Sequence, residues 1–219
     1  AKPAPLSMAI LFVDAVAAFH RVIRQLVAHV DSGRSEEIEM WRIAQHFQLT
    51  PEAYLELVAL LDEACAMEQA GASDHLHRCA AEAMCNNWCN AAFSDKLLET
   101  GTGTKPGDPV GDVLFNFVFA RVLKSVRQSL EDAGMQLLVG GQKQDPTVSF
   151  VDDLAVMVAV DKPRPLVSAA SAAGGITISC LHRFGMQVNV KPKKTEVMLE
   201  FNGAGRDAAK REALSGGHI

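Results

Sequence analysis

Apolar segments that end in aspartates constrain the fold of this chain more than any other feature of its sequence. Residues Met8–Val13 form an unbroken apolar run that ends at Asp14. A continuous run of this length predicts a central strand that is covered on both faces. Residues 147–150 and 154–160 are two further strand candidates, and the short segment between them contains Asp152 and Asp153. This pattern predicts a tight hairpin with acids at its tip.

Helical patterns occupy most of the segment that follows the first strand. Apolar residues recur at helical spacing over 16–30, which predicts a helix directly after that strand. Capping residues followed by helix formers predict three more helices, at about 35–47, 50–70 and 73–92. Residues 36–100 are therefore expected to form a mostly helical insert.

The C-terminal half combines helices with further strands. Asp108 followed by Pro109 predicts the start of a long helix that stops at Gly134, and residues 165–184 read as a helix interrupted by Gly174-Gly175. Residues 186–190 and 195–201 predict a final strand pair, and 202–219 are expected to be a flexible tail. The predicted fold class is α+β, with a small antiparallel sheet that carries the acids and is backed by helices.

The composition is that of a globular protein, with 48% apolar and 21% charged residues. No apolar run reaches the roughly 18 residues that a membrane span needs, and the N-terminus lacks the pattern of a signal peptide. We therefore expect an intracellular protein without a membrane partner, in either the nucleus or the cytoplasm. The five cysteines are an odd number, which favours reduced thiols over a disulfide scaffold.

The aspartates at the strand ends are candidate metal ligands. If the strands are neighbours, Asp14, Asp152 and Asp153 converge, and close carboxylates repel one another unless a cation lies between them. Carboxylate oxygens suit Mg²⁺ or Mn²⁺, and two such ions about 3.5–4 Å apart support phosphoryl transfer. The alternative is a turn with solvated acids, which the apolar flanks of the hairpin disfavour.

Four segments of the chain resemble, in order and spacing, the palm motifs of reverse transcriptases of the non-LTR (LINE-type) retrotransposon kind. They are Phe12–Phe19, Gly103–Phe115, Phe150–Asp153 and Gly185–Asn189 followed by Lys194–Glu196. Each motif alone is weak, but four in this order are specific. The resemblance implies a polymerase palm at 1–201 that lacks most of the fingers and thumb. On this interpretation the chain is a fragment of a longer retroelement protein.

The resemblance also implies a catalytic site. Asp14, Asp152 and Asp153 match the aspartates that hold two Mg²⁺ or Mn²⁺ ions. Lys194 matches a lysine near the departing pyrophosphate, where a cation offsets developing charge. The alternative for Lys194 is an exposed basic turn.

Four residues match positions that contact nucleotide or template in this family. Phe19 matches the bulky residue that screens the sugar 2′ position and favours dNTP over rNTP, although without the resemblance a core phenylalanine explains it equally well. Gly107 matches the glycine at which the backbone approaches the nascent pair or the template. Asp108 and Pro109 complete that motif.

Two positions depart from the family pattern. The family usually has Asp where this chain has His20, and Gln where it has Pro106. His20 lies outside the proposed metal ligands. Pro106 removes an amide side chain and a backbone donor near the expected position of template and dNTP.

The activity implied by the resemblance is RNA-directed DNA polymerisation, in which dNMP is added to the 3′ end of a DNA primer on an RNA template. An alternative of a different class is an inactive retroelement remnant that at most binds nucleic acid. A third is an RNA-templated RNA polymerase palm, which Phe19 and the Phe-Val-Asp-Asp tip disfavour. The sequence does not determine the oligomeric state.

A cluster of metal-binding residue types lies in the insert. Its members fall within fifteen residues and are His75, His77, Cys79, Cys85 and Cys89. Thiolate and imidazole are zinc ligands, but this spacing fits no common zinc finger. Cys85 and Cys89 at i, i+4 also describe one buried helix face, which is the interpretation we favour.

Taken alone, the net charge of −5 argues against a nucleic-acid partner. The charge is unevenly distributed, because residues 36–100 hold 12 acidic and 3 basic residues while the remainder carries +4. With the three candidate metal ligands set aside, that remainder carries +7. A surface of this sign is compatible with a phosphate backbone.

Overall fold

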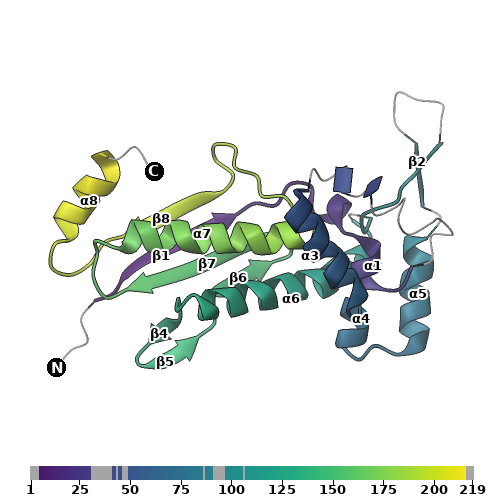
Figure 1. Cartoon of the computed structure of the whole chain (residues 1–219), viewed down its shortest axis with the longest axis horizontal. Helices are drawn as coiled ribbons and strands as arrows, with labels where there is room; N and C mark the ends of the chain where they lie inside the picture. Colours follow the sequence, from purple (N-terminus) through teal and green to yellow (C-terminus); the bar gives the residue numbers. More distant parts are fainter. Residues whose placement is uncertain are drawn as a thin grey trace. The chain divides into compact units, whose positions relative to one another are not determined.

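A computed structural model describes residues 5–30, 41, 42, 44, 45, 49–85, 87–90, 97–105 and 107–215 (Figure 1). The chain divides into two compact units. The first, here called the sheet unit, comprises Ala1–Ala15, Leu123–Cys180 and Val188–Ile219. The second, the helical unit, comprises Val16–Val122 and Leu181–Gln187. The helix expected at 35–47 lies largely outside the described residues.

The sheet unit is built on a four-stranded sheet with the order β6-β7-β1-β8, in which all neighbours are antiparallel. Its strands are Ser7–Val13 (β1), Thr147–Phe150 (β6), Asp153–Val160 (β7) and Glu196–Glu200 (β8). Helix α6 (Pro109–Asp132) lies before β6 in the chain, and α7 (Leu166–Arg183) connects β7 to β8. This β-α-β-β-α-β order is a split β-α-β arrangement. The expected α+β class with a small antiparallel sheet is confirmed.

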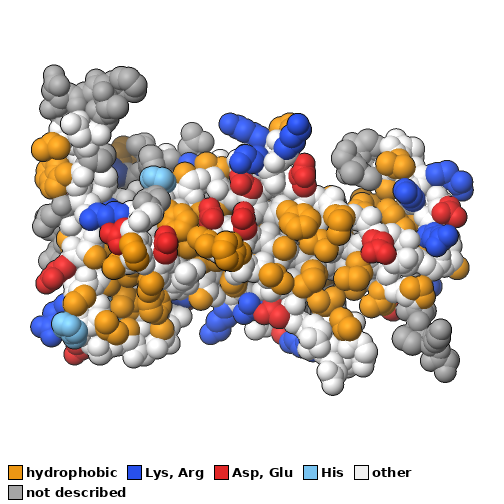
Figure 2. Space-filling view, turned by 180° about the vertical axis from the view of Figure 1, so that it is seen from behind, with side chains coloured by type: hydrophobic (Ala, Val, Ile, Leu, Met, Phe, Trp, Pro, Cys, Tyr) orange, Lys and Arg blue, Asp and Glu red, His pale blue; other side chains and the backbone are white. Residues whose placement is uncertain are grey.

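The sheet has one covered and one open face. Ala9, Leu11 and Val13 are buried, and a Cβ added to Gly174 in α7 would lie 3.2 Å from Leu11 Cδ2, so this helix packs closely on β1. On the opposite face Phe12 is 47% exposed. Figure 2 shows hydrophobic side chains gathered over this face, with acidic side chains among them. Strand β1 is central as expected, but the expectation that both of its faces are covered is wrong.

Asp145 fastens α6 to the start of β6. Its carboxylate accepts hydrogen bonds from the Thr147 backbone N–H at 2.9 Å, the Thr147 hydroxyl at 2.8 Å and Arg127 Nε at 2.9 Å. Partial burial raises the pKa of Asp145, but the hydrogen bonds from Thr147 and the guanidinium of Arg127 outweigh burial and hold the pKa below its ordinary value. This connection therefore depends on an ionised carboxylate.

The helical unit contains short helices and one small hairpin. They are η1 (Ala18–Arg21), α1 (Arg24–Val27), α3 (Pro51–Asp62), α4 (Ala66–Gln69), α5 (Asp74–Met84), β2 (Trp88–Asn90) and β3 (Leu97–Glu99). The predicted caps are confirmed, because the Thr50 hydroxyl accepts from Ala53 N at 3.2 Å and the Ser73 hydroxyl accepts from Leu76 N at 3.4 Å.

Three helix predictions in this unit need correction. The continuous helix expected over 16–30 is wrong, because Ala17 has a φ of 48° and Val22 and Ile23 are extended, which breaks the segment into η1 and α1. The helix expected to reach about 70 ends at Asp62. The helix expected to reach about 92 ends at Met84 and is followed by the β2-β3 hairpin.

The C-terminal third also differs from expectation. Helix α7 runs without interruption through Gly174-Gly175. Residues 186–190 contribute a single bridge, Ala15 to Val188, and β8 pairs with β1 instead of with them. Part of the expected flexible tail is helix α8 (Arg206–Ser215). Within the part of the chain that the structure describes, no helix combines the length and the apolar character that crossing a bilayer requires.

Candidate functional site

The register of the two central strands places Asp14 and Asp153 next to each other. Val13 pairs with Leu154 at the end of the β1-β7 ladder, so Asp14 lies one register step further, beside the start of β7. Asp153 is the first residue of β7 and pairs with Phe150 of β6. Because opposite residues in an antiparallel pair share a face, Asp153 lies on the open face together with Phe150. Two carboxylates from distant parts of the sequence thus meet at one end of the sheet.

The backbone of Asp14 is held by the segment 189–195. Asn189 N donates to Asp14 O at 2.8 Å, and Asp14 N donates to Thr195 Oγ1 at 3.2 Å. Thr195 N donates in turn to Asn189 O at 3.1 Å. Both polar groups of the Asp14 backbone are therefore satisfied by one loop, which fixes the residue just after its strand ends.

Lys194 contacts Asp14 from the same loop. Its Nζ lies 3.6 Å from Asp14 Oδ1, and the two side chains are 52% and 30% exposed. A partly exposed pair of this kind contributes at most about 1 kcal/mol. Lys194 thus offsets the charge of the Asp14 carboxylate, but the ion pair contributes little free energy that would keep the lysine side chain in this position. The structure thus places Lys194 beside Asp14, one of the three candidate metal ligands.

The turn that carries Asp152 has a strained backbone. Val151 has a φ of 55°, and Asp152, the second residue of the turn, is not among the residues of positive φ. This is the pattern of a type II′ turn, in which glycine is preferred at the first central position. A β-branched residue in this conformation costs about 1–3 kcal/mol and is typical of functional sites. The strain lies directly before the two aspartates.

All three non-glycine residues of positive φ in the described chain are close in sequence to the candidate site. Besides Val151 they are Ala17, three residues after Asp14, and Lys193, directly before Lys194. Strain of this kind persists only where surrounding contacts enforce it. The strained residues therefore lie in or directly beside three of the four motif segments.

The carboxylates do not form a closed ligand cluster. Among the described residues, only one set of three or more His, Cys, Asp and Glu residues has ligand atoms that all lie within 4.8 Å of one another, and it is His29, Cys65 and Glu68. Asp14 and Asp153 are neighbours by register. The carboxylate oxygens of Asp14, Asp152 and Asp153, however, do not all lie within 4.8 Å of one another.

Phe19 lies in η1 of the helical unit. Its ring stacks on Phe115, with centroids 4.4 Å apart, and Phe115 stacks on Phe119 at 5.2 Å. Phe115 is fully buried, whereas Phe19 is half-buried. One part of the Phe19 ring thus belongs to the core and another remains accessible.

Gly107, Asp108 and Pro109 form the start of α6. Asp108 Oδ1 accepts a hydrogen bond from Val110 N at 2.9 Å, so Asp108 caps the helix as the sequence predicts. Gly107 is exposed and has a φ of 83°, and a Cβ at this position would have nothing within 4 Å. The backbone conformation alone therefore explains why this position is a glycine. Pro106 lies outside the described residues.

Arg24 is a positioning residue that sequence reasoning missed. It is 5% exposed, and its Nε donates to Gly103 O at 3.0 Å. Its two terminal nitrogens donate to Thr100 O at 2.5 Å, Thr100 Oγ1 at 2.9 Å and Thr102 O at 3.0 Å. A single buried guanidinium thus shapes the loop that leads into Gly107 and Asp108. The sequence offered one sign of this role, namely a charged residue within the mostly apolar segment 22–27.

The cluster of metal-binding residue types at 75–89, for which zinc was the less favoured interpretation, is only partly assembled. His75 Nε2 lies 3.7 Å from Cys79 Sγ, one helical turn apart on α5, and both residues are exposed. No group of three ligands forms among His75, His77, Cys79 and Cys85 in the described structure. The side chain of Cys89 lies outside the described part.

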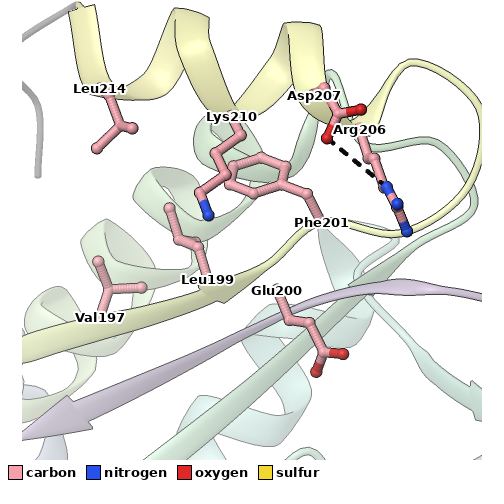
Figure 3. Close-up of a pocket in the computed structure, with 8 residues that line it drawn as sticks. All are labelled: Val197, Leu199, Glu200, Phe201, Arg206, Asp207, Lys210 and Leu214. Carbon is pink, nitrogen blue, oxygen red and sulfur yellow. Dashed lines mark ion pairs between the residues drawn. The ribbon is translucent and has the colours of Figure 1, made fainter.

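A groove of about 480 Å³ lies between β8 and α8, away from the aspartates (Figure 3). Val197, Leu199 and Leu214 provide apolar walls, and Lys210 extends over them from α8. Arg206 at the start of α8 pairs with Asp207 at 3.7 Å. The sequence did not predict this groove, because the residues of α8 that form one side of it were expected to belong to a flexible tail.

Comparison with known proteins adds no assignment to this geometry. No model of a known protein family matches the chain. No curated protein matches it either.

Proposed function

We propose that the sheet unit is the palm of a template-directed nucleotidyltransferase, an RNA-directed DNA polymerase similar to the reverse transcriptases of non-LTR retrotransposons. One observation carries the proposal, namely the β1-β7 register that brings Asp14 beside Asp153. The strained turn at Val151 and the contact between Lys194 and Asp14 support it. The split β-α-β order, with helices on one face and acids at the end of the other, is compatible with a polymerase palm.

The donor types suit a hard divalent cation, although the three carboxylates do not lie within 4.8 Å of one another in this structure. Asp14, Asp152 and Asp153 offer only carboxylate oxygens, which Mg²⁺ and Mn²⁺ prefer. When bound there, two such ions would lower the pKa of the primer 3′ hydroxyl and stabilise the negative charge on the phosphates. Lys194, which pairs weakly with Asp14, is free to turn its ammonium toward the departing pyrophosphate.

Two further roles in the proposal come from the resemblance and concern residues of the helical unit. Phe19, which stacks on Phe115, would be the residue that excludes a 2′ hydroxyl. Gly107, after the loop that Arg24 holds, would be the position at which the backbone approaches the template. Proposed partners are an RNA template, a DNA primer and dNTPs.

Primer extension tests the proposal. The full chain is incubated with an RNA template, a labelled DNA primer, dNTPs and Mg²⁺ or Mn²⁺. We expect extension by the parent protein, none by Asp152→Asn, and parental activity in Asp161→Asn, since Asp161 is an exposed acid beyond the far end of β7. Extension that survives in Asp152→Asn contradicts the metal role. Nucleic-acid binding without extension in every variant supports the alternative of an inactive remnant.

Sugar selectivity tests the role of Phe19. In Phe19→Ala we expect the ratio of rNTP to dNTP incorporation to rise, because the ring no longer occupies the space beside the sugar. The ratio is the informative measurement, since a folding defect lowers both rates together. An unchanged ratio assigns Phe19 to the core alone.

A further inference from the structure

Four potential metal ligands from three segments gather in the helical unit. His29 follows α1, Cys65 precedes α4, Glu68 lies in α4, and His77 lies in α5. The ligand atoms of His29, Cys65 and Glu68 all lie within 4.8 Å of one another. The His77 ring stacks beside that of His29, with centroids 6.4 Å apart. We propose that His29, Cys65, Glu68 and His77 bind a zinc-class divalent cation, a site independent of the proposed polymerase activity.

The unpaired nitrogen of His77 is the second observation behind this proposal. His77 Nε2 is buried and has no hydrogen-bond partner. A buried polar atom without a partner is costly, and an ion is one of the explanations for such an atom in a native structure. The His77 ring stacks beside that of His29, and a shift of its side chain would bring this nitrogen to the other three ligands as a fourth donor. Four donors of these types make a tetrahedral zinc site.

The contacts that His29, Cys65 and Glu68 already make are compatible with a bound cation. Glu68 Oε2 accepts from Cys65 N at 2.9 Å, while Glu68 Oε1 lies 3.0 Å from His29 Nε2. A cation bound between Oε1 and Nε2 would leave the bond from Cys65 N to Oε2 intact, which orients the carboxylate. Zinc–ligand bonds of about 2.0–2.3 Å place tetrahedral ligands roughly 3.3–3.8 Å apart, so the three residues need only small adjustments.

The thiol supports zinc in preference to Mg²⁺ or Ca²⁺. Cys65 is free and 2% exposed. On metal binding its S–H proton passes to solvent and the thiolate forms the metal–sulfur bond, which hard cations do not favour. The bound ion would cross-link the segment after α1 to α4 and α5.

Cobalt is the probe, because tetrahedral Co²⁺ absorbs visible light and a cobalt–thiolate bond adds a near-ultraviolet band. The full chain is stripped with a chelator and titrated with Co²⁺, then with Zn²⁺ as competitor. We expect one thiolate-bound Co²⁺ per chain, displaced by Zn²⁺. Carboxylate sites such as Asp14 and Asp153 give no thiolate band, so the readout does not depend on them.

Variants identify the ligands. Cys65→Ser is expected to abolish the thiolate band, and His77→Ala to weaken binding at least about tenfold. Cys79→Ser is the matched control and is expected to bind as the parent does, because Cys79 is an exposed cysteine of the same unit that does not belong to the ligand cluster. His29→Ala is also expected to weaken binding, and its side chain is 68% exposed, so the variant will fold.

Three results would overturn the proposal. One is a parent protein that shows no thiolate band at micromolar Co²⁺. Another is a band that persists in Cys65→Ser or disappears in Cys79→Ser, which would move the site to the His75–Cys79 pair. Unchanged affinity in both His29→Ala and His77→Ala would likewise exclude this ligand set.

Discussion

Replacing Arg24 by methionine removes a buried guanidinium while keeping an unbranched side chain of similar length. Arg24 donates hydrogen bonds to the carbonyl oxygens of Thr100, Thr102 and Gly103 and to the hydroxyl of Thr100. Each buried acceptor left without a partner costs about 1–3 kcal/mol. Water reaches part of this loop, because Gly101 is exposed and Thr100 and Thr102 are half-buried. We therefore expect a loss of about 3–5 kcal/mol in the free energy of unfolding, from several acceptors that are each only partly hydrated.

Urea unfolding followed by tryptophan fluorescence measures this loss. Both tryptophans, Trp41 and Trp88, belong to the helical unit, so their emission reports on the unit that contains Arg24. Arg78→Met is the matched control, because Arg78 lies exposed on α5 of the same unit. We expect a large decrease in the urea midpoint for Arg24→Met and almost none for Arg78→Met. Equal midpoints would refute the reasoning that Arg24 holds the 100–104 loop.

Three further predictions concern stability. Gly175→Ala in α7 is expected to stabilise the protein by about 0.5–1 kcal/mol. Gly174→Ala is expected to stabilise it less, because a Cβ at Gly174 would lie close to Leu11 whereas one at Gly175 would not. Equal gains in thermal unfolding would contradict the close packing of α7 on β1. Thr50→Ala is expected to cost about 1 kcal/mol in urea unfolding by removing the cap of α3, and an unchanged midpoint would exclude that role. The folded pKa of Asp145 lies below its unfolded value, so its contribution is complete above the unfolded pKa of about 3.9 and is lost as pH falls through the folded pKa. Stability should therefore decline less steeply below about pH 4 in Asp145→Asn than in the parent, and identical slopes would contradict this.

Local pattern was sufficient for elements whose signals lie within the element itself. Strand β1 follows from the apolar run at 8–13, and α6 follows from the Asp108 cap and a long apolar stripe. The β6-β7 hairpin likewise follows from two short apolar runs around a turn. In each case the residues that decide the structure are close in sequence, so pattern and structure agree.

Local pattern failed where distant contacts override it. The apolar spacing at 16–30 is typical of a helix, yet Arg24 turns toward the 100–104 loop and Ala17 adopts a left-handed conformation. The segment at 186–190 has the composition of a strand, but β8 occupies the edge of β1 and leaves it a single bridge. Conversely, the polar composition after 202 did not indicate α8. The apolar side of this helix consists of only two small buried residues, Ala209 and Ala213.

The sequence alone identified the candidate site residues at the strand ends, because the positions of Asp14, Asp152 and Asp153 after apolar runs are local facts. Only the tertiary structure decided which of these residues are neighbours. The β1-β7 ladder brings Asp14 beside Asp153, and hydrogen bonds from Asn189 and Thr195 hold Asp14 in place. Likewise His29, Cys65 and Glu68 have no common sequence pattern, and packing alone brings them together. Ladder register and helix packing depend on contacts between residues far apart in the chain, which no local periodicity encodes.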